Sequence, residues 1–462
     1  MIGSQERWQE DLFVAGSLRD LIPKDHILRR VDRVLDLSWL RDELRDCYCE
    51  DNGRPGIDPE AALRLMLAGL FHGITHDRKL MREAQVNLAI RWFAGFPVNA
   101  RLPNHSSLTR IRQRWGEERF RRIFQRTVQA CLKAKLVNAE TVHIDATLIR
   151  ANVSYESYAQ GHAGRVLGAN EIPTSGEKRK VSRTDPDAGF ATSSRKNGSE
   201  PSYKQHTAID DSHGVIVDVL PTRGDVNEGN ELVAQIQRIE TATGKSVKQV
   251  TADAGYAHGK VYAAMEGRQI TAVIPPRPML PTRTAIPVQR FKYDDRAQLV
   301  RCPRGRVLRR SSRVDHGWVY KSRTSDCRRC PLRESCLSPS VGRRAVCISD
   351  GYAALLRARR LRPNWQQQHH TLYKRHRWRA EGAHSEAKGQ HGLGRAIRRG
   401  LWNVAVQVYL TAAAMNLKRL AASPYWPKFV SALRAMTSVL RDHWLPAAFF
   451  FEHRAMAPAC IC

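Results

Sequence analysis

A chain of 462 residues, 42% of them hydrophobic, is long enough for two or three domains with substantial cores, and this excludes wholesale disorder. Its 75 lysines and arginines outnumber 45 aspartates and glutamates, which gives a formal net charge of +30. Such an excess most often means a polyanionic partner, with a membrane surface or the ribosome as competing explanations. The start, MIGSQERWQEDLF, lacks the apolar core of a signal peptide, so we expect a soluble, intracellular protein without membrane contact.

Helical patterns dominate the first 137 residues. Apolar residues recur with helix-like spacing over 18–46. Asp58, followed by Pro, marks the start of a strongly apolar helix, PEAALRLMLAGLFHGI, and another helix is expected over 78–94. We therefore predict an all-α N-terminal domain over residues 1–137.

The last helix of this region is basic. It lies within PNHSSLTRIRQRWGEERFRRIFQRTVQACL and carries Arg110, Arg112 and Arg114, with Ser106 or Ser107 as its expected N-cap. A basic helix in a protein of this charge indicates contact with DNA. The alternative is that the helices form a plain scaffold.

After residue 138 the pattern changes from helical to alternating. ETVHIDATLIRA is predicted to be a strand with Asp145 inside it, and a buried acid without a partner is costly, so Asp145 indicates a function. SYKQHTAID and VIVDVLPT form a predicted hairpin, and the helix that follows ends at Gly244. SVKQVTADAGYAHG then gives another strand, whose end carries Asp253.

The rest of the chain divides by composition. Residues 138–275 are expected to be the first part of an α/β core, interrupted by a flexible basic loop over 155–202. Residues 276–364, rich in Pro, Arg and Cys, form a predicted insertion. Residues 365–422 complete the core, and 423–462 form a C-terminal tail. Within the second core part, the apolar run from 401 to 422 is interrupted by polar residues, so we expect a buried helix rather than a membrane span.

The stretch from 371 to 400 concentrates Arg, Lys and His around two carboxylates. As a helix up to Gly389 it puts four residues on one stripe, namely Arg377, Glu381, His384 and Lys388. Glu386 lies about 140° around the helix from Glu381. One acid among bases is typical of a site that handles phosphate and a divalent metal; an exposed, salt-bridged helix is the alternative.

Three acids now stand in a defined order. Asp145 on the first strand, Asp253 at the end of the fourth and Glu381 on a late helix have the arrangement of a ribonuclease-H-like core, a mixed sheet with flanking helices. In that fold the acids hold two divalent ions about 4 Å apart, and carboxylates suit Mg²⁺ or Mn²⁺. Glu386 is the rival for the third acid, but only Glu381 shares a face with Arg377 and Lys388.

From about residue 18 to 422 the sequence resembles the DDE transposases of bacterial insertion sequences. The resemblance rests on Asp145 in HIDATLIRA, Asp253 in TADAGYA, and Arg377-x3-Glu381-x6-Lys388, which matches part of that group's Tyr-x2-Arg-x3-Glu-x6-Lys signature. Tyr373 stands one residue too far from the arginine for the signature, which leaves its role open.

The resemblance implies an enzyme that binds the element ends, cuts DNA with Mg²⁺ or Mn²⁺ and joins the 3′-hydroxyls to a target. The partners would be double-stranded DNA and further copies of the chain, at the nucleoid in the bacterial cytoplasm. The alternatives are a metal-dependent nuclease without strand transfer and a DNA-binding relative that is no longer catalytic.

The resemblance also assigns roles to single residues. Asp145, Asp253 and Glu381 would be the catalytic metal ligands. Lys388 would contact DNA phosphate, and Arg377 would orient the DNA backbone or the glutamate. Lys204 and His206 are similar to basic residues that the family has in this hairpin, although a structural role is the alternative for both.

A cysteine cluster stands apart from these acids. Cys302, Cys327, Cys330 and Cys336 lie within the predicted insertion, and Cys327-x2-Cys330 has the spacing of a zinc ligand pair. Disulfides are not expected in an intracellular chain. The four cysteines are therefore either a structural four-thiolate zinc site or unligated thiols.

Overall fold

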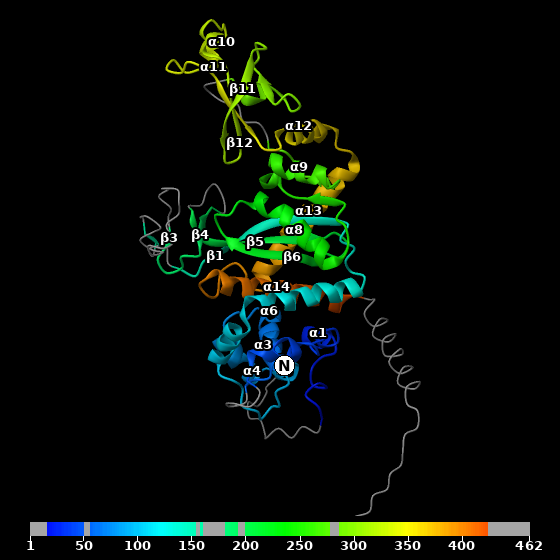
Figure 1. Ribbon diagram of the computed structural model, residues 1–462. Helices are drawn as coiled ribbons and strands as arrows, with labels where there is room; N and C mark the ends of the chain where they lie inside the picture. The colour runs from blue at the N-terminus through cyan, green and yellow to red at the C-terminus, as the bar shows by residue number, and fades with distance from the viewer. Residues whose placement is uncertain are drawn as a thin grey trace, which may run out of the picture.

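The computed structural model describes residues 16–49, 56–153, 158–159, 181–192, 199–277 and 286–423. Figure 1 shows three tiers, with helices at the bottom, a sheet flanked by helices in the middle and a smaller sheet at the top. Among the described residues no helix is long and apolar enough to cross a membrane. All but the first residue of the predicted tail over 423–462, and most of the predicted basic loop over 155–202, lie outside the described residues.

Helices make up the first tier: α1 (Ile27–Asp32), α2 (Leu40–Glu43), η1 (Arg45–Cys47), α3 (Pro59–Phe71), α4 (Asp77–Val86), α5 (Leu88–Phe93) and α6 (His105–Lys133). The single helix predicted over 18–46 is wrong, because α1 and α2 are separate. Asp36 causes the break, since its carboxylate accepts hydrogen bonds from the backbone N–H and the hydroxyl of Ser38 and so favours a turn. The helix predicted over 78–94 is likewise divided, at Asn87, which caps α5.

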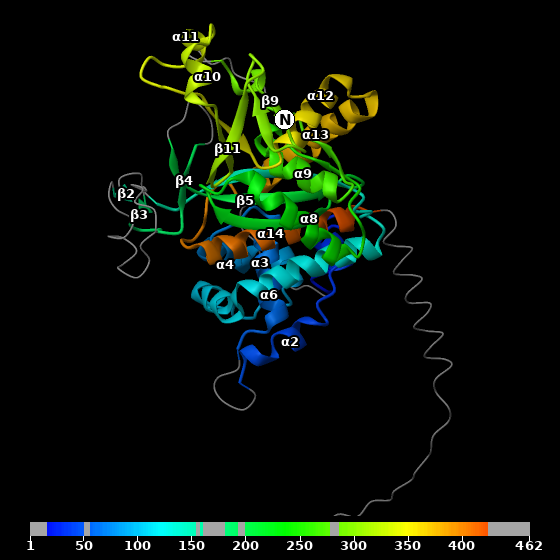
Figure 2. The ribbon, with the colours of Figure 1, turned by 45° about the horizontal axis from the view of Figure 1, so that its top comes forward.

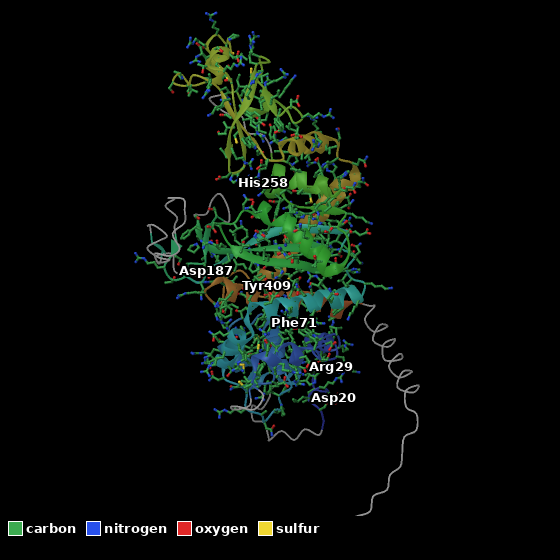
Figure 3. All side chains as sticks on the ribbon, in the orientation of Figure 1. Asp20, Arg29, Phe71, Asp187, His258 and Tyr409 are labelled. Atoms are coloured by element: carbon green, nitrogen blue, oxygen red, sulfur yellow. The ribbon has the colours of Figure 1, made fainter. Side chains whose placement is uncertain are left out.

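The long helix α6 joins this tier to the next. Its N-cap is Asn104, not Ser106 or Ser107 as predicted, and the Asn104 side chain accepts a hydrogen bond from the Ser106 N–H. Gly116 interrupts the helix with a φ of 71°, which glycine adopts without strain. Figures 1 and 2 both show α6 beside α14 (Leu401–Ala422). Tyr409, labelled in Figure 3, lies on α14. Its ring stacks on Phe124 of α6 at 6.4 Å between centroids.

The central sheet has the strand order β6-β5-β1-β7-β8, and β4 continues the β6 side of β5. The strands are β1 (Thr141–Arg150), β4 (Gly189–Ala191), β5 (Glu200–Asp210), β6 (Ile216–Arg223), β7 (Gln249–Thr251) and β8 (Thr271–Val273). β5 pairs antiparallel with β1, β6 and β4, whereas β7 and β8 run parallel to β1. A two-stranded ribbon, β2 (Tyr158–Ala159) with β3 (Val181–Ser182), stands outside this sheet.

The helices of the central tier that cover the sheet are α8 (Glu228–Thr243), α9 (Gly259–Gly267), α13 (Gln367–Gln390) and α14, and α6 of the first tier also contacts β6. The predicted end of α8 is confirmed, because Gly244 closes it with a φ of 66°. The bounds of α14 coincide with the apolar run from 401 to 422, and most of its residues are buried against β6, β5 and α6. The predicted buried helix is therefore confirmed.

The third tier is a five-stranded antiparallel sheet, β9 (Lys292–Asp294), β10 (Leu299–Arg301), β11 (Val307–Val314), β12 (Gly317–Lys321) and β13 (Ala345–Ser349), preceded by η4 (Val288–Arg290) and joined by α10 (Thr324–Arg328) and α11 (Arg333–Cys336). The chain then returns through α12 (Tyr352–Leu361) and η5 (Arg362–Asn364), and α12 packs on α9. A Cβ on Gly259 would lie 2.5 Å from the Asp350 carbonyl oxygen, so this close approach requires glycine. The last part of the segment 276–364 thus lies on the central tier.

Candidate active site

Strand β1 presents Asp145 toward helix α13. His143 and Asp145 lie on one face of the strand, where the His143 ring is 5.9 Å from His376 of α13 and Asp145 Oδ2 is 3.5 Å from Nδ1 of His384. Asp145 Oδ1 accepts a hydrogen bond of 2.8 Å from the N–H of Ala146. Its side chain is only 20% exposed, so this carboxylate is largely withdrawn from water.

Asp253 lies two residues after the end of β7, as Asp145 lies two residues after His143, the β1 partner of Thr251. Since β1 and β7 run parallel, their carboxyl ends point the same way. Asp253 Oδ1 accepts a hydrogen bond of 2.8 Å from the Gly255 N–H and starts the 3₁₀ helix η3 (Ala254–Tyr256). Arg277 fixes this turn, because its guanidinium donates to the carbonyl oxygens of Ala254 (2.9 Å) and Gly255 (3.1 Å).

Helix α13 carries both Glu381, the predicted third acid, and its rival Glu386. Arg377 Nε lies 3.1 and 3.2 Å from the two carboxylate oxygens of Glu381, and the Glu381 side chain is 62% exposed. Its rival Glu386 turns toward α14, where Lys418 and Arg419 bind it at 2.7 and 3.1 Å. Burial alone would raise the pKa of Glu386, but its hydrogen bonds and these cations lower it to about 2. Glu386 is thus an internal ion-pair partner.

The acids share one electrostatic environment. Burial raises the pKa of Asp145 to about 7, reinforced by the negative charges of Asp253, Glu228 and Glu381. Nearby, the hydroxyl of the fully buried Tyr256 has no hydrogen-bond partner among the described residues. Concentrated negative charge with oxygen donors suits a hard divalent cation. In this arrangement, however, no three His, Cys, Asp or Glu side chains of the described residues are placed to hold one ion.

A buried polar network docks α13 on the sheet. The Thr251 hydroxyl lies 2.7 Å from His143 Nδ1 and 2.9 Å from His376 Nδ1, which connects β1, β7 and α13. The other ring nitrogen of His143 is 2.9 Å from Asp211, and Arg375 of α13 binds that same carboxylate. These contacts fix the position of α13 on the sheet and its rotation about its own axis, and hence the positions of Glu381 and His384.

Three further residues of the core were predicted to contact DNA, namely Lys388, Lys204 and His206. Lys388 is exposed. Partial desolvation lowers its pKa while Asp145 raises it, so the lysine stands close to the site. Lys204 donates to the Val226 carbonyl oxygen at 2.8 Å and lies 3.3 Å from Glu228. His206 is fully buried, bonds Thr222 at 2.9 Å, and burial lowers its pKa to about 3. A buried neutral histidine does not meet DNA, so for His206 the structural alternative replaces the predicted DNA contact.

Three side chains of this site were not among the predicted site residues: Glu228, Tyr256 and His384. Glu228 is the first residue of α8, where an acid is ordinarily explained by the helix dipole. Tyr256 looks like any core aromatic in the sequence. Only His384 carried a signal, because it lies on the stripe of Glu381.

Two family models match this chain. The Transposase domain (DUF772) matches residues 16–114, and the Transposase DDE domain matches residues 301–421, which include α13. Together these two matches support a DDE transposase of insertion-sequence type. No curated protein matches it.

Solved structures of other transposases show low similarity. The piggyBac transposase synaptic complex with hairpin DNA shares 13% identity over 91% of this chain and 82% of that chain, with a TM-score of 0.29. The Mos1 mariner paired-end complex with Mn shares 14% identity over 51% and 64% of the two chains, with a TM-score of 0.17. These TM-scores are too low to support an argument, so the assignment rests on the family models.

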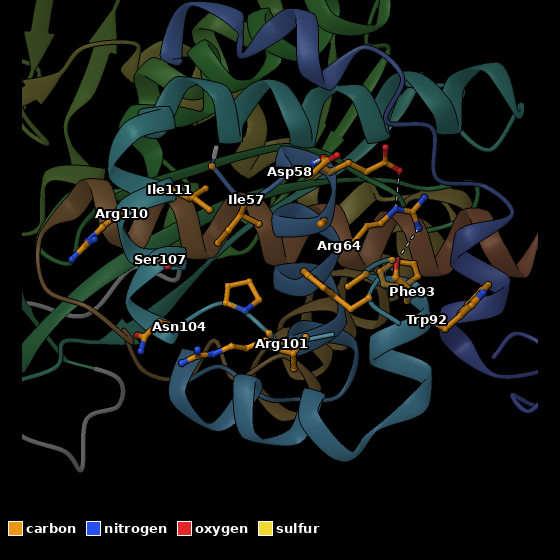
Figure 4. Close-up of a pocket in the computed structure, with 18 of the residues that line it drawn as sticks. Ile57, Asp58, Arg64, Trp92, Phe93, Arg101, Asn104, Ser107, Arg110 and Ile111 are labelled. Atoms are coloured by element: carbon orange, nitrogen blue, oxygen red, sulfur yellow. Dashed lines mark hydrogen bonds and ion pairs between the residues drawn. The ribbon is translucent and has the colours of Figure 1, made fainter. Parts of the chain in front are cut away.

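The helical tier of the transposase contains a pocket of about 1130 Å³ between α3, α5 and α6. Figure 4 shows Arg101, Asn104 and Arg110 on the side away from Trp92, and Arg114 also lines the pocket. Arg110 and Arg114 are exposed, which leaves them accessible to a ligand.

Arg112, in contrast, is buried. It binds both carboxylate oxygens of Asp77, at 2.7 and 2.9 Å. A guanidinium committed to a buried carboxylate is not available to DNA, so the predicted DNA contact of Arg112 is corrected to a structural ion pair.

The four cysteines that the sequence grouped are neighbours in the third tier. Burial raises the pKa of Cys336, and Cys327, Cys330 and Cys302 raise it further, because thiolates close together repel. The Cys327 sulfur lies 3.1 Å from the Ser322 hydroxyl. All eight cysteines among the described residues are free thiols.

Proposed function

We propose that this transposase cuts DNA at the ends of its element and joins the 3′-hydroxyls to a target, with Asp145, Asp253 and Glu381 as the acids that hold divalent metal. The proposal is supported by the raised pKa of the largely buried Asp145, which Asp253 and Glu381 lie near enough to raise further. The strand order, three antiparallel strands followed by two parallel ones, supports a ribonuclease-H-like core.

The three acids fit Mg²⁺ or Mn²⁺, since all donors are oxygens. Bound ions would activate the attacking oxygen and stabilise the leaving 3′-oxygen. Arg377 orients the Glu381 carboxylate through a hydrogen bond from its Nε. His384 contacts Asp145 through its Nδ1 and so helps to orient that carboxylate. Lys388 stands beside a pocket of about 450 Å³ that Arg150 and Arg395 also line, so it is placed to bind a DNA phosphate.

DNA recognition belongs, in this proposal, to residues 1–137. The exposed Arg110 and Arg114 would face the DNA backbone at the ends of the element, together with Arg101 at the pocket rim. The segment 276–364 inserts between the two parts of the core. The transposase would act as a homo-oligomer that brings two ends together at the bacterial nucleoid.

The function is tested with a DNA fragment that ends in the inverted repeat flanking the gene. With Mg²⁺, we expect cleavage of the uncut fragment, and a fragment with a pre-cleaved 3′-end should become joined to a target plasmid. Hydrolysis without joined product would instead favour the nuclease. Binding of the repeat without cleavage in Mg²⁺ or Mn²⁺ would favour an inactive DNA-binding relative.

We also propose that Cys302, Cys327, Cys330 and Cys336 bind one structural zinc ion. Their thiols are near enough to influence one another's ionisation, and zinc would relieve this repulsion by binding the thiolates. No set of described residues is arranged as a finished metal site, so binding would draw the thiols together.

The purified chain is expected to contain about one zinc, with four sulfur ligands at ~2.3 Å by X-ray absorption. Cys327→Ser should lose the metal and make 286–364 sensitive to protease, because binding contributes to folding of such segments. Cys347→Ser is the matched control, since Cys347 is an exposed thiol on β13 of the same tier. A zinc-free chain with a protease-resistant segment would contradict the site.

A further inference from the structure

Glu228 lies at the edge of the acidic site. It is the first residue of α8, whose N-cap Asn227 accepts a hydrogen bond from the Gly229 N–H. A Cβ placed on Gly255 would lie 2.7 Å from Asp253 Oδ1 and 2.9 Å from Glu228 Oε2. The two carboxylates therefore converge over Gly255, and the glycine leaves the space between them open to a small ligand.

Lys204 is the cation beside Glu228. Its Nζ lies 3.3 Å from Glu228 Oε1 and donates to the Val226 carbonyl oxygen at 2.8 Å. Its side chain is only 11% exposed, which holds the charge at the site. A salt bridge would be a sufficient explanation of Glu228 if nothing else approached it. The other carboxylate oxygen of Glu228, Oε2, lies instead on the side of Gly255 and Asp253.

Tyr256 provides an independent observation. It is fully buried, and its hydroxyl has no hydrogen-bond partner among the described residues. Burial raises its pKa, and Asp145, Glu228 and Asp253 raise it further, so the hydroxyl stands among these three carboxylates. Leaving a buried hydroxyl unpaired is costly. Water bound to an ion held by the carboxylates would supply the missing partner.

We propose that Glu228 is a fourth carboxylate of the metal centre, which binds a divalent cation together with Asp253, while Lys204 neutralises Glu228 when no cation is bound. The inference rests on the proposed function, since it requires metal at Asp145 and Asp253. It adds a ligand from α8, a helix that carries none of the three predicted acids.

The test measures Mn²⁺ binding to the purified full-length chain without DNA, by the electron paramagnetic resonance signal of free Mn²⁺. Glu228→Gln is expected to weaken binding by about tenfold or more. Glu228→Asp keeps the charge but withdraws the oxygens by one methylene, so it should weaken binding as well. Glu231→Gln, the same change one turn along α8, is the matched control and should bind like the unmodified chain.

Lys204→Met is expected to change the affinity for Mn²⁺ in the opposite direction. Without its ammonium group Glu228 has no competing cation, so Mn²⁺ should bind more tightly, a gain that misfolding cannot produce. Unchanged affinity in Glu228→Gln, or an equal loss of affinity in Glu231→Gln, would overturn the inference. If Asp253→Asn leaves Mn²⁺ binding unchanged, the metal centre itself fails, which separates the two proposals.

Discussion

Asp145→Asn, Asp253→Asn and Glu381→Gln are each expected to abolish metal-dependent DNA cleavage while leaving DNA binding and folding intact. Each change removes one charged oxygen donor at nearly constant volume, and metal-assisted phosphoryl transfer requires the whole ligand set. The measurement is cleavage of an end-bearing fragment in Mg²⁺, with gel-shift affinity determined in parallel.

Glu386→Gln is the matched control for Glu381→Gln. Because Glu386 pairs with Lys418 and Arg419 away from Asp145, its loss should lower stability more than the rate of cleavage. An inactive Glu386→Gln beside an active Glu381→Gln would show that the third acid has been assigned to the wrong residue.

Asp145→Asn has a second consequence, which separates lost catalysis from lost structure. The pKa of Asp145 is raised from 3.8 to about 7, so between these values the folded chain holds a proton that the unfolded chain releases. Stability of the metal-free protein therefore falls as pH rises from about 4 to 7, by about 1.4 kcal/mol per unit of pKa difference. Asn carries no charge, so the variant should be more stable than the parent at pH 7.5 without metal.

The sequence predicted best those elements that local pattern determines. Gly244 ends α8 and the apolar run from 401 to 422 becomes α14, because a left-handed cap and a continuous buried face are written in neighbouring residues. The order of the acids was also readable, since a strand carrying Asp145 and a strand end carrying Asp253 constrain the topology.

Side-chain roles that depend on distant partners were not readable. Arg112 and Arg110 are two residues apart on one helix, yet the first is buried against Asp77 of α4 and the second is exposed. His206 lies on β5, an inner strand of a sheet that helices cover, and it is fully buried, which its local sequence does not reveal. Glu228 joins the acids only because the start of α8 packs over η3.

Asp77→Asn is expected to be the most destabilising single change outside the active site. Its carboxylate is 7% exposed, accepts two hydrogen bonds from Arg112 and also binds Arg398, which follows α13. Removing one partner of a buried pair leaves an uncompensated charge, and such changes cost about 3–5 kcal/mol. Because α4, α6 and the segment after α13 meet here, the loss should loosen the N-terminal helices from the core.

Urea unfolding followed by circular dichroism measures this cost. Asp42→Asn is the control, since Asp42 pairs with Arg45 while both are largely exposed and such pairs contribute at most about 1 kcal/mol. Burial acts to raise the pKa of Asp77, but Arg112 and Arg398 lower it overall. Its contribution is therefore complete above pH 4 and is lost as pH falls through the depressed value, so parent and variant should converge in acid. Equal costs for Asp42→Asn and Asp77→Asn at pH 7 would contradict the role of this buried ion pair.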